Sequence, residues 1–207
     1  MEDLVTERRR ERVATALSDR MGSVVAVAEA IHRRHNSSAI LRSCEAFGVH
    51  EIHLIHEGFS PSAGAARGAE RWVYTRSFPS TVQSLTELQA RGFHIYVADF
   101  IEPCWTPEEV PVDHPIAVVF GSEARGVSDT ARSFARGAIT IPMRGLTASL
   151  NVSVSAALIL RTVADRRRAL VGPDLPLRER SRFYEAWLAD ETLAHKGFLR
   201  RTSEDGA

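Results

Sequence analysis

Short, unbroken apolar runs that alternate with helix-like segments constrain this chain more than any other feature of its sequence. The runs lie at residues 24–31, 52–55, 93–98 and 116–120. A strand with one face in water alternates apolar and polar residues, whereas a strand covered on both faces is apolar throughout. The pattern therefore predicts an α/β fold in which a parallel sheet carries helices on both faces.

The segment from Ile139 to Asp165 contains the longest predicted helix and the loop that leads into it. A short extended run ends at Pro142, and the loop covers residues 143–148. Ser149 is predicted to be the N-cap, because a serine hydroxyl accepts a hydrogen bond from a first-turn N–H group. The helix is rich in small residues, so we expect another segment, a ligand or a second subunit to pack closely against it.

Helical additions are expected at both ends of one central domain. A basic amphipathic helix is predicted within residues 1–20, the α/β domain within 21–170, and a helical extension within 171–207. Asn36 is a candidate N-cap for a helix that ends at Gly48. The other predicted segments are helices at 80–91, 128–136 and 177–194, a loop or short helix at 60–70, an extended run at 72–75 and a proline-bearing connection at 103–115.

Composition points to a cytoplasmic protein. No apolar run approaches the roughly 20 residues that a membrane span needs, and the charged N-terminus lacks the apolar core of a secretory signal. Cys44 and Cys104 belong to no metal-binding or redox motif, so we expect free thiols in a reducing compartment. Neither membrane association nor a disulfide is therefore expected.

The formal net charge is zero, which argues weakly against a nucleic-acid partner. Arginines nevertheless cluster near both ends, and guanidinium groups bind phosphates in bidentate fashion. These clusters are candidate RNA contacts or, equally, solvated helix faces. They comprise Arg8, Arg9, Arg10 and Arg12 near the N-terminus, and Arg166, Arg167 and Arg168 near the end of the long helix.

Common catalytic motifs of α/β enzymes are absent. No strand is followed by G-x-G-x-x-G or by G-x-x-x-x-G-K-[ST], and neither H-E-x-x-H nor G-x-S-x-G occurs. His50, His53 and His56 suggest a metal site, but on a strand His53 points away from the other two. The sequence therefore disfavours nicotinamide enzymes and P-loop proteins, and we expect no metal.

Three separated stretches nevertheless form a specific combination. The first is N-x5-R-x4-F-G, with Asn36, Arg42, Phe47 and Gly48; the second is F-G-S-E-x-x-G, with Gly121, Glu123 and Gly126. The third is I-P-M-x5-S-L-N-V-S, which runs from Ile141 to Ser153. In this order and spacing they resemble the motifs of the SpoU/TrmH family of RNA ribose 2′-O-methyltransferases, in the SPOUT superfamily. The flanking segments resemble the tRNA-specific branch of that family.

This resemblance implies a C-terminal trefoil knot at about residues 116–165, whose loops hold S-adenosyl-L-methionine in a bent conformation. General rules of chain topology would not predict it, because polypeptide chains are almost never knotted. A threaded chain leaves little room, which would explain the small residues Ala148, Ser149, Ser153 and Ala156.

The resemblance also implies which residues form the site. The implied catalytic residues are Arg42, Asn36, Glu123, Ser149 and Asn151. The expected cofactor-binding residues are Ala98, Gly121, Ile141, Met143 and Leu150. Several of them have simpler roles open: Asn36 and Ser149 as helix caps, Glu123 as an organiser of its loop, Gly121 and Gly126 as turn residues, and the apolar ones as ordinary core.

Methyl transfer to a ribose hydroxyl is an in-line displacement at a sulfonium carbon and needs no metal. The protein must align the reacting atoms, exclude water and manage one proton. Because a guanidinium stays protonated, Arg42 is expected to clamp a substrate phosphate and orient the hydroxyl, while a phosphate oxygen, a carboxylate or water takes the proton. An exposed arginine on an amphipathic helix is the alternative.

By resemblance the preferred substrate is guanosine 18 in the D-loop of tRNA, and the protein is a homodimer with both subunits contributing to each site. One alternative keeps the reaction but moves it to ribosomal RNA. A second is an RNA-binding protein without catalysis, and a third is an unrelated α/β metabolic enzyme.

Overall fold

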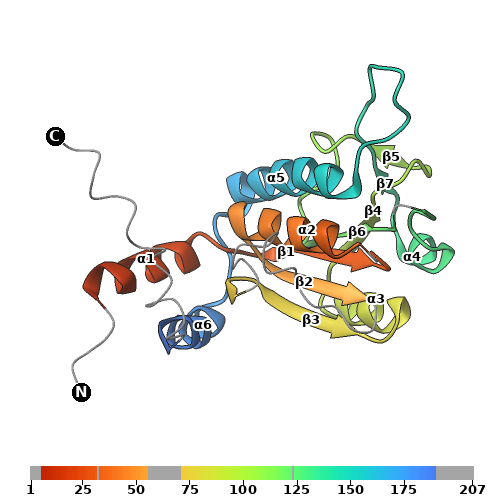
Figure 1. The fold of residues 1–207 in the computed structure, drawn as a ribbon. Coiled ribbons are helices and arrows are strands. Elements are labelled where there is room, and N and C mark those ends of the chain that lie inside the picture. Colours follow the sequence, from red (N-terminus) through yellow and green to blue (C-terminus); the bar gives the residue numbers. More distant parts are fainter. Residues whose placement is uncertain (1–5, 32, 56–70, 123, 190–207) are drawn as a thin grey trace. The chain divides into compact units, whose positions relative to one another are not determined.

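The computed structural model describes residues 6–31, 33–55, 71–122 and 124–189. They form two compact units, one spanning Arg20–Asp174 and the other combining residues 6–19 with residues 175–189. The larger unit is built on a seven-stranded sheet with the order β3-β2-β1-β6-β4-β7-β5 (Figure 1). The strands are β1 Met21–Glu29, β2 Val49–Ile55, β3 Tyr74–Phe78, β4 His94–Val97, β5 Cys104–Trp105, β6 Ile116–Phe120 and β7 Ala138–Ile139.

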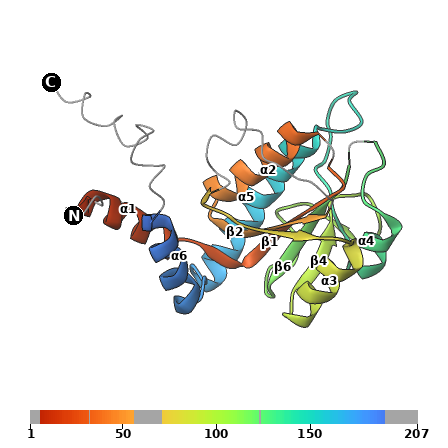
Figure 2. The ribbon, with the colours of Figure 1, turned by 60° about the horizontal axis from the view of Figure 1, so that its bottom comes forward.

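Every strand pairing in this sheet is parallel, which confirms the predicted α/β class. Helices cover both faces: α2 (Arg34–Ala46) and α5 (Val152–Val171) lie on one face, and α3 (Thr81–Ala90) and α4 (Asp129–Phe134) lie on the other (Figures 1 and 2). The unbroken apolar runs follow from this arrangement, because side chains from both faces of the central strands are buried.

Strand β1 shows how one apolar run serves two cores. Val24, Ala26 and Ala28 pack into the core beneath α2 and α5, while Val25 and Val27 pack into the core beneath α3 and α4. All five side chains are completely buried. Alternating side chains thus enter opposite layers, as the pleat of a strand requires.

The smaller unit consists of α1 (Glu7–Ser18) and α6 (Leu177–Ala189). Thr6 caps α1, since its hydroxyl accepts a hydrogen bond from the Arg9 N–H group at 3.3 Å. The guanidinium of Arg9 donates to the backbone oxygen of Trp187 at 2.9 Å and is buried there. Segments from opposite ends of the sequence therefore belong to one unit.

Two predicted helix caps are wrong. Helix α2 begins at Arg34, so Asn36 lies inside its first turn, with its N–H donating to the Arg33 backbone oxygen at 2.9 Å. Helix α5 begins later than expected, and its N-cap is Asn151 rather than Ser149. Residue type alone does not decide the cap: asparagine and serine are equally good caps, and α2 begins after Arg33, which makes no side-chain cap bond.

Other differences are smaller. The proline-bearing connection contains the two-residue strand β5, which pairs with β7 at the edge of the sheet. A strand this short leaves no periodic pattern in a sequence. Predicted residues 60–70 and the end of the C-terminal helix beyond Ala189 lie outside the described residues.

Candidate functional site

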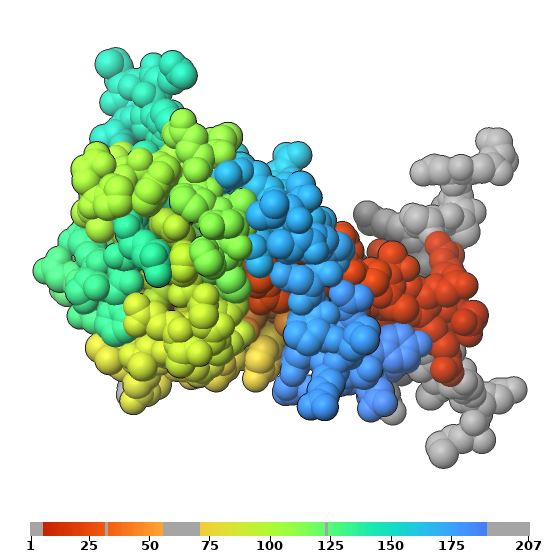
Figure 3. Space-filling view, turned by 180° about the vertical axis from the view of Figure 1, so that it is seen from behind, coloured from red at the N-terminus to blue at the C-terminus, as the bar shows by residue number. Residues whose placement is uncertain are grey.

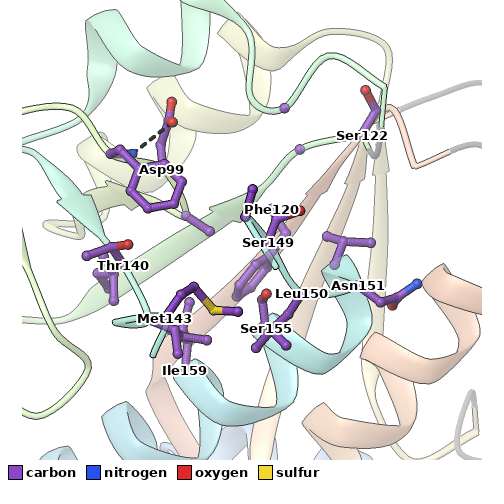
Figure 4. A pocket seen from close by; sticks show the side chains of 18 of the residues that line it. Asp99, Phe120, Ser122, Thr140, Met143, Ser149, Leu150, Asn151, Ser155 and Ile159 are labelled. Atoms are coloured by element: carbon purple, nitrogen blue, oxygen red, sulfur yellow. Dashed lines mark hydrogen bonds between the residues drawn. The ribbon is translucent and has the colours of Figure 1, made fainter. Parts of the chain in front are cut away.

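A pocket of about 440 Å³ opens at the carboxyl ends of β4, β6 and β7, beside the start of α5 (Figure 4). This is the edge of a parallel sheet where ligands usually bind. Its lining comes from segments that are far apart in the sequence. The lining residues are Arg33; Ala98, Asp99 and Phe100; Phe120, Gly121, Ser122 and Gly126; Ile139, Thr140, Ile141 and Met143; Ala148, Ser149, Leu150, Asn151, Val152, Ser155 and Ile159.

All the residues expected to bind a cofactor line this pocket, namely Ala98, Gly121, Ile141, Met143 and Leu150. They come from three separate connections that follow β4, β6 and β7. Figure 4 shows Met143 extending from its loop toward the beginning of α5. The sheet edge therefore brings apolar side chains and exposed backbone of these connections to one place.

The loop that joins β7 to α5, teal in Figures 1 and 3, stands out from the surface. Leu146 in this loop is fully exposed, whereas Met143 at one end and Ser149 at the other line the pocket. Both ends of the loop are thus held at the pocket while its tip extends into solvent.

Gly121 marks an unusually close approach of two chain segments at the pocket wall. A Cβ atom at this position would lie 2.1 Å from the carbonyl carbon of Gly126 and 2.2 Å from the nitrogen of Val127. Gly126 has a φ of 66° and donates its N–H to the Ser122 oxygen at 2.8 Å. Glycine is required at 121 because any side chain would displace the returning loop.

Asn151 links the two helices that carry the first and third motifs. Its Oδ1 accepts hydrogen bonds from the Ser153 N–H at 2.8 Å and hydroxyl at 2.6 Å, which caps α5. Its Nδ2 donates to Oδ1 of Asn36 at 3.3 Å. Asn36 is completely buried, so it reaches the pocket through Asn151.

Arg42 does not line the pocket of its own chain. It lies on α2, more than one turn beyond Asn36, and its side chain is exposed. The two predicted catalytic residues of the third motif, Ser149 and Asn151, do line the pocket. Glu123 lies outside the described residues.

Asp99 is a lining residue that the sequence reasoning missed. Its Oδ2 accepts a hydrogen bond from Nε of Arg132 at 2.8 Å, and its Oδ1 accepts one from the Phe100 N–H at 2.8 Å. The bond to Asp99 is the main reason why the pKa of Arg132 is raised. Asp99 and Phe100 directly follow β4 and Ala98, so the rule that ligands meet strand carboxyl ends would have found them.

Four further polar residues of the lining were not predicted: Arg33, Ser122, Thr140 and Ser155. Among the described residues that line the pocket, Arg33 is the only cation. It is exposed and forms no side-chain cap on α2. Ser155 lies one helical turn after Asn151, a spacing that could have indicated a shared face.

The arginine cluster at the end of α5 is engaged in hydrogen bonds to backbone oxygens of other segments. Arg167 is buried, with Nε donating to the Ser23 hydroxyl at 3.0 Å and Nη1 to the Val112 oxygen at 2.9 Å. The remaining acceptors are the oxygens of Pro107 and Val110 for Arg166, and that of Phe47 for Arg168. These bonds hold α5 against neighbouring connections.

The N-terminal arginine cluster is divided between two roles. Arg9 is buried against α6, whereas Arg8 and Arg12 are exposed and Arg10 is half-buried. Only part of the predicted basic surface is thus open to an anionic partner.

No cluster of three or more His, Cys, Asp or Glu side chains that could hold a metal ion occurs within the described residues. His53 instead bonds to Glu51 and Ser84. No helix in the described part of the chain is long and apolar enough to cross a membrane.

Comparison with known proteins shows a consistent group of relatives. Residues 23–161 match the SpoU rRNA Methylase family. The tRNA (guanosine(18)-2'-O)-methyltransferase of Thermus thermophilus is 40% identical over 187 residues, which cover 89% of this chain and 96% of that protein.

Solved structures agree with this grouping. The TrmH/SpoU tRNA modifying enzyme of Aquifex aeolicus superposes with a TM-score of 0.79 at 31% identity, covering 88% of this chain and 95% of the other. The SpoU methyltransferase AviRb from Streptomyces viridochromogenes, in complex with the cofactor AdoMet, shares the fold with a TM-score of 0.61 at 21% identity. It covers 73% of this chain and 62% of the other.

Proposed function

This chain belongs to the SpoU rRNA Methylase family, and we propose from that premise that it transfers a methyl group from S-adenosyl-L-methionine to the ribose 2′-hydroxyl of guanosine 18 in the D-loop of tRNA. Relatives that match nearly its whole length are named for this reaction. The observation that carries the proposal is the pocket at the sheet edge, where connections bearing the second and third motifs meet.

The pocket suits the methyl donor in size and chemistry. Its volume of about 440 Å³ lies within the usual range for small-molecule sites, roughly 300–1,000 Å³. Ile141, Met143 and Leu150 offer apolar walls for the adenine and ribose, and the adjoining backbone offers donors and acceptors. Asp99, an anion, lines the pocket as well, which favours a ligand that carries positive charge. When bound, the donor supplies a methyl group already activated by its sulfonium.

The residues of this chain then have to orient the hydroxyl and manage its proton. Arg42 clamps a substrate phosphate and aligns the 2′-hydroxyl, and a phosphate oxygen, a carboxylate such as Glu123 or water receives the proton. Ser149 and Asn151 supply polar contacts at the pocket wall. Asn36 holds Asn151 in place through their hydrogen bond.

A homodimer completes the site in this scheme. Arg42 is exposed and outside the pocket of its own chain, so it is available to serve the pocket of a second copy. Val154 and Leu158 lie one turn apart on α5, each 46% exposed, and supply an apolar surface for that copy. Both observations support a shared site but do not depend on each other.

We also propose the trefoil knot at about residues 116–165. The contact of Gly121 with the Gly126–Val127 backbone and the small side chains at the start of α5 are what a tightly threaded chain requires. The proposed knot lies within the central domain predicted at residues 21–170, and we retain that domain division as part of the proposal.

Binding of tRNA is assigned to exposed cations on two surfaces, each considered by itself. Arg33 stands at the pocket rim, and Arg8 and Arg12 are exposed on α1. Contacts of arginine with phosphate are independent of sequence and weaken as salt increases. A tRNA substrate also implies a cytoplasmic protein.

Transfer of labelled methyl from the donor to unmodified tRNA tests the proposal. We expect 2′-O-methylguanosine at position 18 and no product when that nucleotide lacks its 2′-hydroxyl. Methylation of ribosomal RNA but not of tRNA would favour the alternative substrate. Donor binding without any methylation of either RNA would favour a non-catalytic RNA-binding protein.

A further inference from the structure

Glu29 is a buried carboxylate at the ligand-binding edge of the sheet. It is the last residue of β1, and only 4% of it is exposed. The preceding residue, Ala28, pairs with Phe120 of the neighbouring strand β6. Glu29 therefore lies beside the point where the connection from Gly121 to Ser128 begins.

The carboxylate accepts three hydrogen bonds from two helix starts. Oε2 accepts the backbone N–H of Ser128 at 2.8 Å, and Oε1 accepts the hydroxyls of Ser128 at 2.6 Å and Thr81 at 2.5 Å. Ser128 is the N-cap of α4, and Thr81 is the first residue of α3. Within the described residues no cationic side chain forms an ion pair with Glu29, and the carboxylate is held by these hydrogen bonds.

Ser128 is the end of the connection that forms one wall of the pocket. Gly121, Ser122 and Gly126 of this connection line the pocket, and Ser122 and Gly126 form an isolated antiparallel bridge. Val127, between Gly126 and Ser128, is buried. Because Val127 alone separates Ser128 from Gly126, a shift of Ser128 is expected to move the wall as well.

We infer that Glu29 is a positioning residue for the methyl-donor pocket: by holding Ser128 it fixes the connection that presents Gly121, Ser122 and Gly126 to the donor. The inference rests on the proposed function for the identity of the ligand. Charge-assisted hydrogen bonds are about twice as strong as neutral ones, so one carboxylate suffices to hold both helix starts. Glu29 itself touches neither donor nor RNA.

Two substitutions test the role at the carboxylate and at its partner. In Glu29→Gln, an NH2 group replaces one of the two carboxylate oxygens and faces a hydrogen-bond donor. We therefore expect the Kd for S-adenosyl-L-methionine to rise about tenfold or more. Ser128→Ala keeps the N–H donor and should raise this Kd by about threefold, while Ser128→Thr keeps both donors and should stay near wild type. At saturating donor, kcat should fall less than KM rises.

Glu51→Gln is the matched control, because Glu51 is another buried carboxylate of the same sheet but has no contact with the pocket. It should lower thermal stability without changing donor affinity. In the ligand-free protein, hydrogen exchange of residues 124–128 should accelerate in Glu29→Gln and stay unchanged in Glu51→Gln.

Folded Glu29→Gln with normal donor affinity and unchanged exchange in residues 124–128 would overturn the assignment of Glu29. Equal losses of donor affinity in both variants would also overturn it, because they would reflect general destabilisation. If the wild-type protein binds no donor, while residues 124–128 still exchange faster in Glu29→Gln than in wild type, the proposed function and the ligand named here would be overturned instead.

Discussion

Two polar clusters on the same sheet use similar residue types in opposite ways. One lines the pocket at the carboxyl ends of the strands. The other, called here the Glu51 cluster, comprises Glu51 and His53 on β2, Arg76 on β3, Ser84 and Glu87 on α3, and Arg91 at the C-cap of α3. In the pocket, polar side chains such as Ser149 and Ser155 face a cavity. In the Glu51 cluster they face one another.

The Glu51 cluster contains a serine, a histidine and a carboxylate connected by hydrogen bonds, as in a catalytic triad, but it cannot act as one. His53 bonds through Nδ1 to the Ser84 hydroxyl and through Nε2 to Glu51, both at 2.8 Å. His53 and Ser84 are completely buried, so no substrate can reach the hydroxyl. The comparison teaches that burial and completed hydrogen bonds, rather than residue type, separate a stabilising cluster from a reactive one.

Electrostatics sharpen the contrast. Burial alone would raise the pKa of Glu51, but hydrogen bonds from His53 and Arg91 outweigh it and hold this pKa well below the ordinary value. The Arg91 guanidinium donates to both carboxylate oxygens, at 2.9 and 2.7 Å. The charge of Glu51 is thus used within the fold, where it binds His53 and Arg91 rather than a ligand.

The largest expected effect comes from Gly121→Ala. The added Cβ would overlap the Gly126–Val127 backbone, so donor affinity measured by calorimetry should fall by at least about 100-fold, which corresponds to roughly 2.7 kcal/mol. Gly145→Ala is the control, because nothing lies within 4 Å of a Cβ there. Normal donor affinity in Gly121→Ala would show that this wall does not contact the ligand.

Replacing the exposed arginine of α2 tests whether function extends beyond the pocket. Arg42→Lys should lower kcat by about 100-fold and leave donor affinity within about twofold, because a lysine loses the bidentate geometry. Arg136→Lys, at another exposed arginine, should change neither. Turnover close to wild type in Arg42→Lys would remove this residue from the chemistry.

A mixing experiment extends this prediction to the shared site. Arg42→Ala and Asn151→Ala proteins, inactive alone, should regain part of the activity when subunits are exchanged, since one intact pocket would then meet one intact arginine. No recovery in verified mixed dimers would place Arg42 with the pocket of its own chain.

Stability should depend on the other cluster. Glu51→Gln should lower the free energy of unfolding by roughly 2 kcal/mol at pH 7. This loss is smaller than that expected for a fully buried ion pair, because Arg91 is partly exposed to solvent. The depressed pKa of Glu51 stabilises the fold above the ordinary value of 4.5, and this contribution is lost as pH falls below it. Urea unfolding between pH 7 and pH 3 should therefore show a weaker pH dependence in Glu51→Gln than in wild type. An identical pH dependence in both proteins would contradict this assignment.

Among the substitutions at motif residues, Asn36→Ala is expected to lower activity least. Asn36→Ala removes the acceptor for Asn151 and should cost about 1–3 kcal/mol of stability, together with a loss of activity of about tenfold or less. Ser43→Ala, on the same helix, removes a hydroxyl bonded within the helix and is the control. A loss of activity as large as that of Arg42→Lys would mean that Asn36 does more than hold Asn151.

Much of the fold followed from local sequence patterns. The strand over 116–120 matches β6 residue for residue. The helices predicted over 80–91 and 128–136 start at Thr81 and Asp129, directly after Ser80 and Ser128, each of which accepts a first-turn N–H group as the N-cap. These features are local and therefore leave a signal in the sequence. Asn36 and Ser149 are residue types that often cap helices as well, but α2 and α5 start at Arg34 and Val152 instead.

The site was less accessible to sequence reasoning. Motif residues indicated where ligand-facing connections would be, and Ile141, Met143 and Leu150 do line one pocket. The motif singles out Arg42, but no local pattern indicates that Arg167 is buried and bonded to Ser23 whereas Arg42 is exposed. Whether an arginine side chain is bonded within the fold depends on partners far away in the sequence, such as Ser23, which precedes Arg167 by 144 residues.

The most direct test of the distinction between the ligand-binding pocket and the stabilising Glu51 cluster is a crystal structure of the protein with S-adenosylhomocysteine, the product of methyl transfer. The account predicts the ligand between Gly121 and the Ile141–Leu150 connection, with the Glu51 cluster unchanged. A ligand bound away from this pocket, in either subunit, would contradict it.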